Sequence, residues 1–221
     1  LLYDAAHAFA VKNKAGQSIL KSGDMSILSF HATKIYNTIE GGAIISHSAE
    51  QKLKIDRLKN FGFVDETTVS YPGINAKMNE VQAAYGILQL KSVDSVIERS
   101  KEIARKYTSF LKEVTGLNPM IDVDSEAFSL NYSYYPVRVG EDFALTRDHM
   151  YEKLKEHNIF IRRYFYPLIT EFEPYNALSS ASTENLPVAS KIASEVLCLP
   201  VYASLSDNDH KRVLEAIHSL C

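Results

Sequence analysis

The longest regular pattern in the sequence is a series of apolar residues with helical spacing between Val93 and Val114. These positions recur every three or four residues, so they form one face of an amphipathic helix. Gly116 follows, and a glycine just beyond such a pattern ends a helix. A different pattern of elements begins after this glycine. We therefore predict one domain over residues 1–116 and a smaller C-terminal domain over residues 117–221.

The first part of the chain alternates short apolar runs with turn residues. The runs "LLY", "ILSF" and "GAIIS" predict short buried strands. Ser48, with Gln51 three residues later, has the pattern of a helix N-cap, and Gly62 would end that helix. Asn79 with Gln82 marks a second helix start. The residues between these helices, "FGFVDETTVSYPGINAK", read as a loop.

The second part alternates strands with helices. We expect strands at "NYSYYPVRV", "IFIRRYFYP" and "LCLPVY". We expect helices from Thr146 to about His157, over residues 186–196, and from Ser206, which has Asp209 three positions later. Alternating strands and helices favour an α/β or α+β arrangement in layers. The fold class predicted for the whole chain is α/β.

Composition excludes several classes of partner. The net charge of -3 and the pI near 6.2 argue against a nucleic-acid-binding surface and against a basic membrane patch. No apolar run approaches the roughly 20 residues of a membrane-spanning helix. The two cysteines, Cys198 and Cys221, are too few for a disulfide framework and fit a reducing cytoplasm. We expect no metal site.

The chain opens with "LLYDAAHAF", which contains no methionine. Leu1, Leu2 and Tyr3 resemble the end of a buried strand, and an independent domain rarely begins there. We expect the polypeptide to extend upstream of Leu1.

The segment "SFHATKIYNTIEGG", residues 29–42, contains an isolated lysine, Lys34. No other lysine or arginine lies within ten positions of it, and its neighbours are small, hydroxylic or aromatic. Upstream, Asp4 follows an apolar strand end, where side chains point into the crevice that binds ligands in α/β sheets. A lysine, a strand-end carboxylate and a phosphate-binding hydroxyl such as Ser29 are the parts of a pyridoxal phosphate site.

Spacing alone leaves other interpretations open. Lys34 could be a surface residue and Asp4 a turn or helix cap, since a lysine near a serine occurs in most proteins. A lysine that forms a Schiff base is also found in lyases and aldolases, which is the second chemical interpretation.

Three blocks of the sequence, in order, resemble the DegT/DnrJ/EryC1/StrS family of sugar aminotransferases. They are "DAAHAFAV", "GDMSILSFHATKIYNTIEGGAIIS" and "FGFVDETTVSYPGINAKMNEVQAAYGILQL". The resemblance is strong over residues 1 to about 115 and looser beyond. It is greatest for members that aminate a dTDP-4-keto-6-deoxyhexose. It implies a fold-type I pyridoxal-phosphate enzyme, with part of a large α/β domain, a smaller C-terminal domain and a homodimer.

The resemblance also implies roles for individual residues. Lys34 would be the Schiff-base lysine, and Asp4 would pair with the pyridine nitrogen. His7 would lie near the pyridoxal ring oxygen, where many members have glutamine, and Ser29 would contact the phosphate. Either Asn75 or Lys77 would reach the phosphate of the partner subunit's cofactor. Further candidates, for contacts to the nucleotide sugar, are His31, Arg163, Tyr164 and Tyr166.

Two hypotheses about function follow. The first is an enzyme that transfers an amino group, from L-glutamate, to a keto carbon of a nucleotide-linked deoxysugar in the cytoplasm, for surface polysaccharide, lipopolysaccharide or antibiotic sugars. The second is a non-catalytic C-terminal fragment or interaction module of such an enzyme, because the resemblance implies that the first half of the family's large domain would lie upstream of Leu1.

Overall fold

The computed structural model describes residues 1–221, which form two compact units. Unit 1 consists of Leu1–Ile97 and Ser125–Asn131, and unit 2 of Glu98–Asp124 and Tyr132–Cys221. The change from one unit to the other falls inside the long helix that begins at Val93. The domain boundary that the sequence predicts near Gly116 lies close to the end of that helix, and it stays a prediction.

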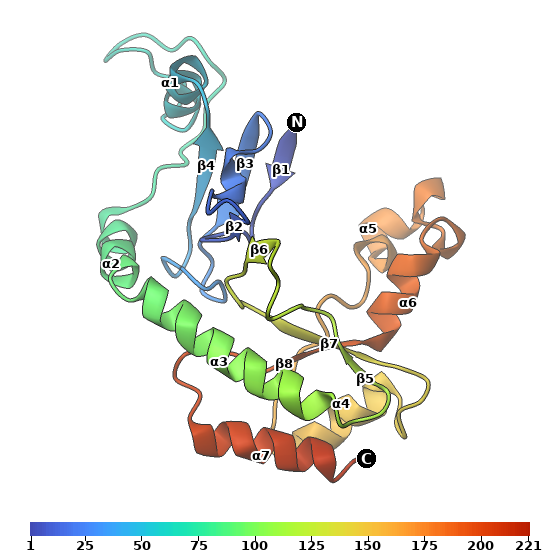
Figure 1. Ribbon diagram of the computed structural model, residues 1–221. Helices are drawn as coiled ribbons and strands as arrows, with labels where there is room; N and C mark the ends of the chain where they lie inside the picture. Colours follow the sequence, from blue (N-terminus) through green and yellow to red (C-terminus); the bar gives the residue numbers. More distant parts are fainter. The chain divides into compact units, whose positions relative to one another are not determined.

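The main sheet of unit 1 contains the three strands that the sequence predicts. They are β1 (Leu2–Asp4), β3 (Met25–Ser29) and β4 (Gly42–Ser46), with β3 in the middle (Figure 1). β1 runs parallel to β3, and β4 is antiparallel to β3. A second, two-stranded pairing joins β2 (Lys12–Asn13) to β6 (Phe128–Ser129), and the sequence pattern does not predict it.

The strands of unit 1 are less buried than we expected. Side chains alternate between the two faces of a strand, so Leu28 is buried while its neighbour Ile27 is 42% exposed. In β1, Leu2 is 55% and Tyr3 43% exposed. The runs "LLY" and "GAIIS" form strands as expected but are not buried, because β1 and β4 are the two edges of this three-stranded sheet.

The two predicted helix starts of unit 1 are confirmed. α1 (Ala49–Leu58) begins after Ser48, whose hydroxyl accepts a hydrogen bond from the Gln51 N–H at 3.1 Å. α2 (Glu80–Leu90) begins after Asn79, whose side chain accepts from the Gln82 N–H at 2.9 Å. The short helix η1 (Ile19–Lys21) completes the elements of this unit.

Unit 2 is built on the antiparallel sheet β5 (Leu117–Pro119), β7 (Tyr135–Val139) and β8 (Val196–Leu199), with β7 in the middle. Its long helices are the C-terminal part of α3 (Val93–Leu111), α4 (Arg147–Glu156), α6 (Pro187–Glu195) and α7 (Asp207–His218). Shorter turns of helix are η2 (Ile169–Glu171), α5 (Glu173–Asn176), η3 (Ser179–Ala181) and η4 (Thr183–Asn185). None of the helices combines the length and the apolar character needed to cross a membrane.

One predicted strand of unit 2 is wrong. In "IFIRRYFYP" only Arg162 pairs with β8, through reciprocal backbone hydrogen bonds with Cys198. The next side chain, Arg163, instead packs its guanidinium over the ring of Tyr151 on α4 and donates to Asp148 at 2.7 Å. Pro167 then lacks the N–H that a longer ladder would need.

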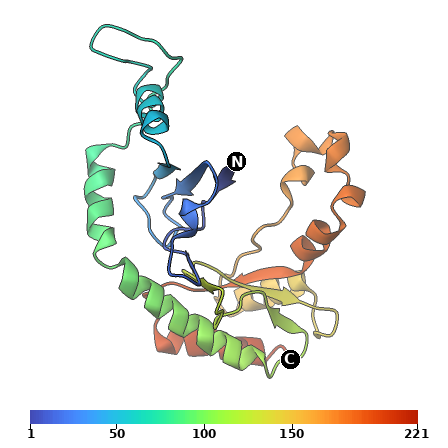
Figure 2. The same ribbon diagram turned by 45° about the horizontal axis from the view of Figure 1, so that its top comes forward.

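The amphipathic helix predicted from Val93 is confirmed as α3. Its buried residues in unit 2 recur every three or four positions: Ser100, Ile103, Ala104, Tyr107 and Leu111. α7 lies alongside this part of α3 in both views (Figures 1 and 2). Tyr107 also reaches the sheet, because its ring lies 5.1 Å from that of Tyr135 on β7.

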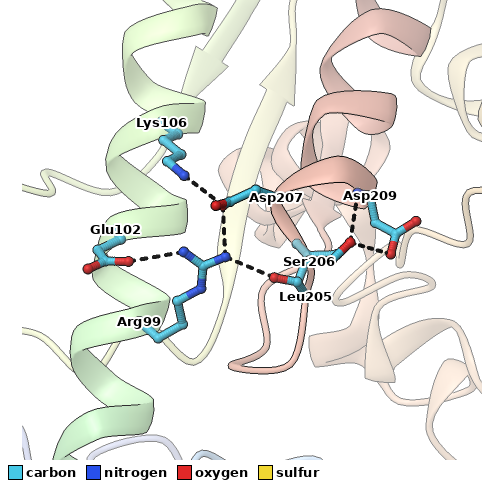
Figure 3. Close-up of polar contacts among 7 residues, drawn as sticks. All are labelled: Arg99, Glu102, Lys106, Leu205, Ser206, Asp207 and Asp209. Atoms are coloured by element: carbon cyan, nitrogen blue, oxygen red, sulfur yellow. Dashed lines mark hydrogen bonds and ion pairs between the residues drawn. The ribbon is translucent and has the colours of Figure 1, made fainter.

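Ion pairs join α3 to the start of α7 (Figure 3). Arg99 donates to the Asp207 carboxylate at 2.9 Å and to the Leu205 carbonyl at 3.0 Å, and Lys106 donates to Asp207 at 2.8 Å. Lys106 and Arg99 lower the pKa of Asp207 to about 2. The carboxylate therefore stays charged at the N-terminus of α7, where the helix dipole also favours a negative charge.

His210, also on α7, is almost fully buried. Its ring is 4.4 Å from that of Tyr107, and its Nε2 has no hydrogen-bond partner. Burial lowers the pKa of His210 below 6.5, Lys106 and Arg99 lower it further, and Asp207 opposes them. The folded protein therefore binds a proton at His210 less readily than the unfolded chain does.

His210→Phe should reduce the pH dependence of stability. As pH falls through about 6.5, the unfolded chain takes up a proton at this histidine before the folded chain does, so acid favours unfolding. The phenyl ring preserves packing on Tyr107 but does not titrate. Urea denaturation at about pH 7.5 and 5.5 should show a smaller loss of stability in the variant than in the parent. His218→Gln, on the exposed side of α7, is the control, and an equal loss in all three proteins would contradict the prediction.

Candidate functional site

The ends of β1 and β3 define the candidate site. Because the two strands are parallel, their C-terminal ends emerge at the same edge of the sheet. Asp4 is the last residue of β1, as predicted, and its carboxylate accepts a hydrogen bond from the Ala6 N–H at 3.1 Å. Ser29 is the last residue of β3, and its hydroxyl accepts from the His31 N–H at 3.3 Å.

Lys34 lies in the connection between β3 and β4, residues 30–41. Two backbone hydrogen bonds close the base of this loop, from the Phe30 N–H to Gly41 at 2.8 Å and from the Thr38 N–H to Phe30 at 2.9 Å. The Lys34 N–H itself donates to the His31 carbonyl at 2.9 Å, which forms a tight turn around the lysine. The lysine is therefore held on a short, closed loop beside the strand ends.

The side chain of Lys34 meets that of His7. The distance between Lys34 Nζ and His7 Nε2 is 3.2 Å. Burial and the neighbouring Lys34 charge lower the pKa of His7 below 6.5, and Asp4 raises it by a smaller amount. A neutral imidazole results near pH 7, and its Nε2 can accept a hydrogen bond from the lysine ammonium.

Three aromatic rings tie the segment after β1 to the Lys34 loop. Phe9 stacks on Tyr36 with ring centroids 4.5 Å apart, and Phe30 meets Tyr36 edge-on at 4.8 Å. Tyr36 is 8% exposed, and burial raises the pKa of its phenol. Since Phe9 follows His7 and Tyr36 follows Lys34 by two residues each, this cluster packs together the backbones that carry the two side chains.

His31 belongs to the same loop. Its Nδ1 lies 2.9 Å from the Thr33 hydroxyl, and its Nε2 lies 3.5 Å from a carboxylate oxygen of Glu40. These contacts bridge the two ends of the loop. The proposed contact of His31 with a nucleotide sugar stays a prediction.

Asn75 and Lys77 lie beyond the loop that follows α1. Asn75 forms a single bridge with Asn60, and Lys77 donates to the Asn60 side chain at 2.8 Å with its ammonium over the ring of Phe61. A pocket of about 280 Å³ joins this region to the end of the Lys34 loop. It is lined by Glu40, Gly41, Gly42, Ala76, Lys77, Met78 and Gln82. Either residue's role toward a partner subunit's cofactor stays a prediction.

The remaining candidates, Arg163, Tyr164 and Tyr166, belong to unit 2. The Arg163 guanidinium pairs with Asp148 and lies over the rings of Tyr151 and Tyr166. Tyr164 stacks on Phe165 at 4.8 Å. Arg163 therefore already has partners within unit 2. A contact of these three residues with a nucleotide sugar stays a prediction.

Sequence reasoning missed Asn131. Its side-chain amide is 7% exposed and donates to the carbonyls of His7 and Phe9, both at 2.8 Å. It lies more than 120 positions from these partners. No local signal in "SLNYSYY" could have connected Asn131 to them. The sequence reasoning also missed the stacking of Phe9 on Tyr36, because the two rings meet only when the Lys34 loop is folded.

The arrangement fits pyridoxal phosphate. An amine, a carboxylate and a hydroxyl, from Lys34, Asp4 and Ser29, lie in the segments that end or follow two adjacent parallel strands. Lys34 and Asp4 both affect the pKa of His7, so the amine and the carboxylate lie near the same imidazole. A carboxylate can hold a ring nitrogen protonated, and an amine can bond to an aldehyde carbon.

Comparison with known proteins gives a consistent result. Residues 1–218 match the DegT/DnrJ/EryC1/StrS aminotransferase family. A dTDP-4-amino-4,6-dideoxy-D-glucose transaminase from Shigella dysenteriae is 46% identical over 220 residues, which is 100% of this chain and 59% of that protein. A protein of the same name from Escherichia coli is 45% identical over 207 residues, which is 94% of this chain and 55% of that protein.

Solved structures agree on the fold. A structure of DesI in the presence of its TDP-sugar product superposes with a TM-score of 0.89 at 34% identity. It covers 99% of this chain, which corresponds to 55% of the DesI chain. The predicted α/β fold of the fold-type I aminotransferases is thereby confirmed for these residues. The chain spans somewhat more than half the length of the relatives it matches.

Tyr36→Ala should destabilise unit 1 and loosen the Lys34 loop. Removing a buried aromatic ring from a core costs about 3–5 kcal/mol, because the cavity collapses only in part. Tyr36→Phe keeps the ring that stacks on Phe9 and serves as the matched control. Hydrogen exchange of the Lys34 and Thr38 amides should accelerate in the alanine variant and change little in the phenylalanine variant. Equal exchange in the parent and the alanine variant would contradict the role of this ring.

Proposed function

The chain belongs to the DegT/DnrJ/EryC1/StrS aminotransferase family, and we propose on this premise that its protein is a pyridoxal-phosphate-dependent sugar transaminase. It moves an amino group from an amino acid, L-glutamate in this proposal, to the keto carbon of a nucleotide-linked deoxysugar. The amino acid becomes its 2-oxo acid and the keto carbon becomes an amine. The observation that carries the proposal is the Lys34 amine 3.2 Å from His7, beside the ends of two parallel strands.

The proposed substrate is dTDP-4-dehydro-6-deoxyglucose. Two relatives with identities of 46% and 45% are named for a dTDP-4-amino-4,6-dideoxy-D-glucose, which is the product expected when that 4-keto sugar is aminated. His31, Arg163, Tyr164 and Tyr166 are the residues proposed to contact the nucleotide sugar. The resulting amino sugar would serve surface polysaccharide, lipopolysaccharide or antibiotic synthesis.

Each residue of the site has a proposed task. When bound, the cofactor supplies an electron sink for the substrate carbon that loses a proton. Lys34 would supply the amine that holds the cofactor aldehyde and would carry a proton to or from the substrate carbon. Asp4 would hold the pyridine nitrogen protonated, and Ser29 would hold the phosphate, together with Asn75 or Lys77 of a second subunit. His7 would lie beside the ring oxygen.

A homodimer is part of the proposal. α2 carries a set of exposed apolar side chains, and Gly86 is its one buried residue. Val81 is 76%, Ile87 63% and Leu88 60% exposed. A helix with so much exposed apolar surface is typical of an interface, and a second copy of the chain is the proposed occupant. The cytoplasmic location stays a prediction that rests on the two free cysteines, Cys198 and Cys221.

The alternative is a non-catalytic fragment or interaction module. It makes the opposite prediction for the purified chain, which would then fail to attach pyridoxal phosphate at Lys34. One experiment on the 221-residue chain therefore separates the two hypotheses. Pyridoxal phosphate is added, bound cofactor is fixed with borohydride, and the peptide that carries the added mass is identified.

Lys34→Ala should abolish this attachment and, in the full native polypeptide containing residues 1–221, should abolish transamination. No other amine of the site can replace it, because Lys34 provides both the covalent bond and the proton carrier. Lys21→Ala, which removes an exposed lysine from η1, is the matched control and should keep the parent's attachment. Mass found on another lysine, or turnover above a trace in Lys34→Ala, would overturn the assignment.

Asp4→Asn should retain the cofactor and lose most of the rate. Without the carboxylate the ring nitrogen is no longer held protonated, so the carbanion formed at the substrate carbon is less stabilised. Interactions aimed at such developing charge are worth about 2.7–4 kcal/mol of barrier. Steady-state turnover in the full native polypeptide measures the loss. A rate within about threefold of the parent, roughly 0.7 kcal/mol, would mean that Asp4 has a structural role.

A further inference from the structure

Asn131 occupies an unusual place in unit 1. It lies at the end of the segment Ser125–Asn131, which belongs to this unit although the residues before and after it belong to unit 2. β6, within this segment, pairs with β2 so that Phe128 lies opposite Asn13 and Ser129 opposite Lys12. The antiparallel direction carries the segment back along residues 7–13 and brings Asn131 to the turn that follows Asp4.

The two hydrogen bonds of Asn131 match its chemistry. One amide NH₂ group provides two donors, and here they reach the carbonyls of His7 and Phe9. Without these donors the two part-buried carbonyls would lose their side-chain partner. Within the turn, the Ala8 N–H donates to the Ala5 carbonyl at 2.9 Å, so residues 5–9 are held from both sides. The backbone that carries His7 is thereby fixed.

This fixed backbone determines where the imidazole lies. His7 Nε2 is 3.2 Å from Lys34 Nζ, and this contact joins the turn after β1 to the loop after β3. The lysine side chain is long and flexible, and a single acceptor at its end limits the directions in which its amine can point. If His7 were displaced, the Lys34 amine could point in more directions.

We propose that Asn131 is a positioning residue that holds the His7 turn, and through it keeps the Lys34 amine oriented for the capture of pyridoxal phosphate. The inference rests on the proposed function of Lys34. It adds a residue from a distant part of the chain that touches neither the cofactor nor the amine. Asn131 also holds the Phe9 carbonyl, but in this proposal its effect on the amine passes through His7, so that effect should vanish when His7 is absent.

The pKa of His7 depends on the groups that face it, and it can be measured without the cofactor. Burial lowers the pKa of His7, Lys34 on the loop after β3 lowers it further, and Asp4 at the end of β1 raises it. Asn131 adds no charge. When the turn loosens, burial and the contact with Lys34 both weaken, so the pKa of His7 should rise toward 6.5.

Asn131→Leu tests this because leucine has the same branched arrangement of side-chain heavy atoms, introduces no charge and removes both donors. Nuclear magnetic resonance titration of the cofactor-free protein should show a higher pKa for His7 in this variant than in the parent. Asn185→Leu is the matched control, since it removes a side-chain hydrogen bond in unit 2, from the Asn185 amide to the Ser179 carbonyl at 3.1 Å. An unchanged His7 titration in Asn131→Leu would overturn the proposal.

Capture of the cofactor provides the second readout. The rate at which added pyridoxal phosphate becomes fixed by borohydride on Lys34 should fall about tenfold in Asn131→Leu, or about 1.4 kcal/mol of barrier. His7→Leu should slow capture as well, and the double variant should be no slower than His7→Leu alone. Independent, additive losses would show that Asn131 acts by another route, through Phe9 or through overall stability, and would overturn the proposal.

Two further outcomes keep the test decisive. If Asn131→Leu does not fold, exchange of the Asn131 side-chain amide protons in the parent replaces it, and fast exchange would overturn the proposal. If the parent attaches no cofactor at Lys34, the proposed function fails, while the cofactor-free titration of His7 still decides whether Asn131 holds the turn.

Discussion

The parallel pairing of β1 with β3 is the constraint on which the candidate site depends. Because both strands run in the same direction, Asp4 and His7 leave the sheet at the edge where Ser29 and Lys34 also leave it. Antiparallel pairing would place the end of β1 beside the start of β3, a strand length of about 16 Å away for five residues. Parallel strands need a crossover, and residues 5–24, with β2 and η1, provide it. The Asn131 segment pairs with this crossover, so the same connection brings both His7 and its support to the site.

The two connections that leave this edge contain the reactive groups, and loops of that kind move unless something packs them. Phe9, Phe30 and Tyr36 supply the apolar contact between them, and the Lys34–His7 contact supplies the polar one. The aromatic cluster does not determine where the Lys34 amine points, whereas a hydrogen bond to the His7 imidazole does. Rigidity of the backbone and orientation of the amine therefore have separate physical sources.

Much of the site could be predicted because the patterns that indicate it lie among residues close together in the sequence. Asp4 follows an apolar run, Lys34 stands alone among small and hydroxylic residues, and the helix caps at Ser48, Asn79, Thr146 and Ser206 all form as their spacing predicts. What the sequence could not predict is long-range. Asn131 meets His7 across more than 120 positions, and its neighbours look like an ordinary strand. "IFIRRYFYP" has the composition of a strand. However, Arg163 contacts Tyr151 and Asp148, and this packing replaces further backbone pairing with β8.

Burial divides unevenly between the two units, and this affects the site. The buried apolar residues of unit 1 are Ala5, Val11, Leu28 and Tyr36, whereas the other buried apolar residues belong to unit 2. Since stabilisation follows the apolar area removed from water, unit 2 has its own core and unit 1 has little. All four residues lie in β3 or in the connections that present His7 and Lys34. Anything that binds only the folded form of unit 1, whether cofactor or a second copy over α2, stabilises that form by mass action. Cofactor capture and association through α2 should therefore reinforce each other, because both draw on the same weakly buried unit.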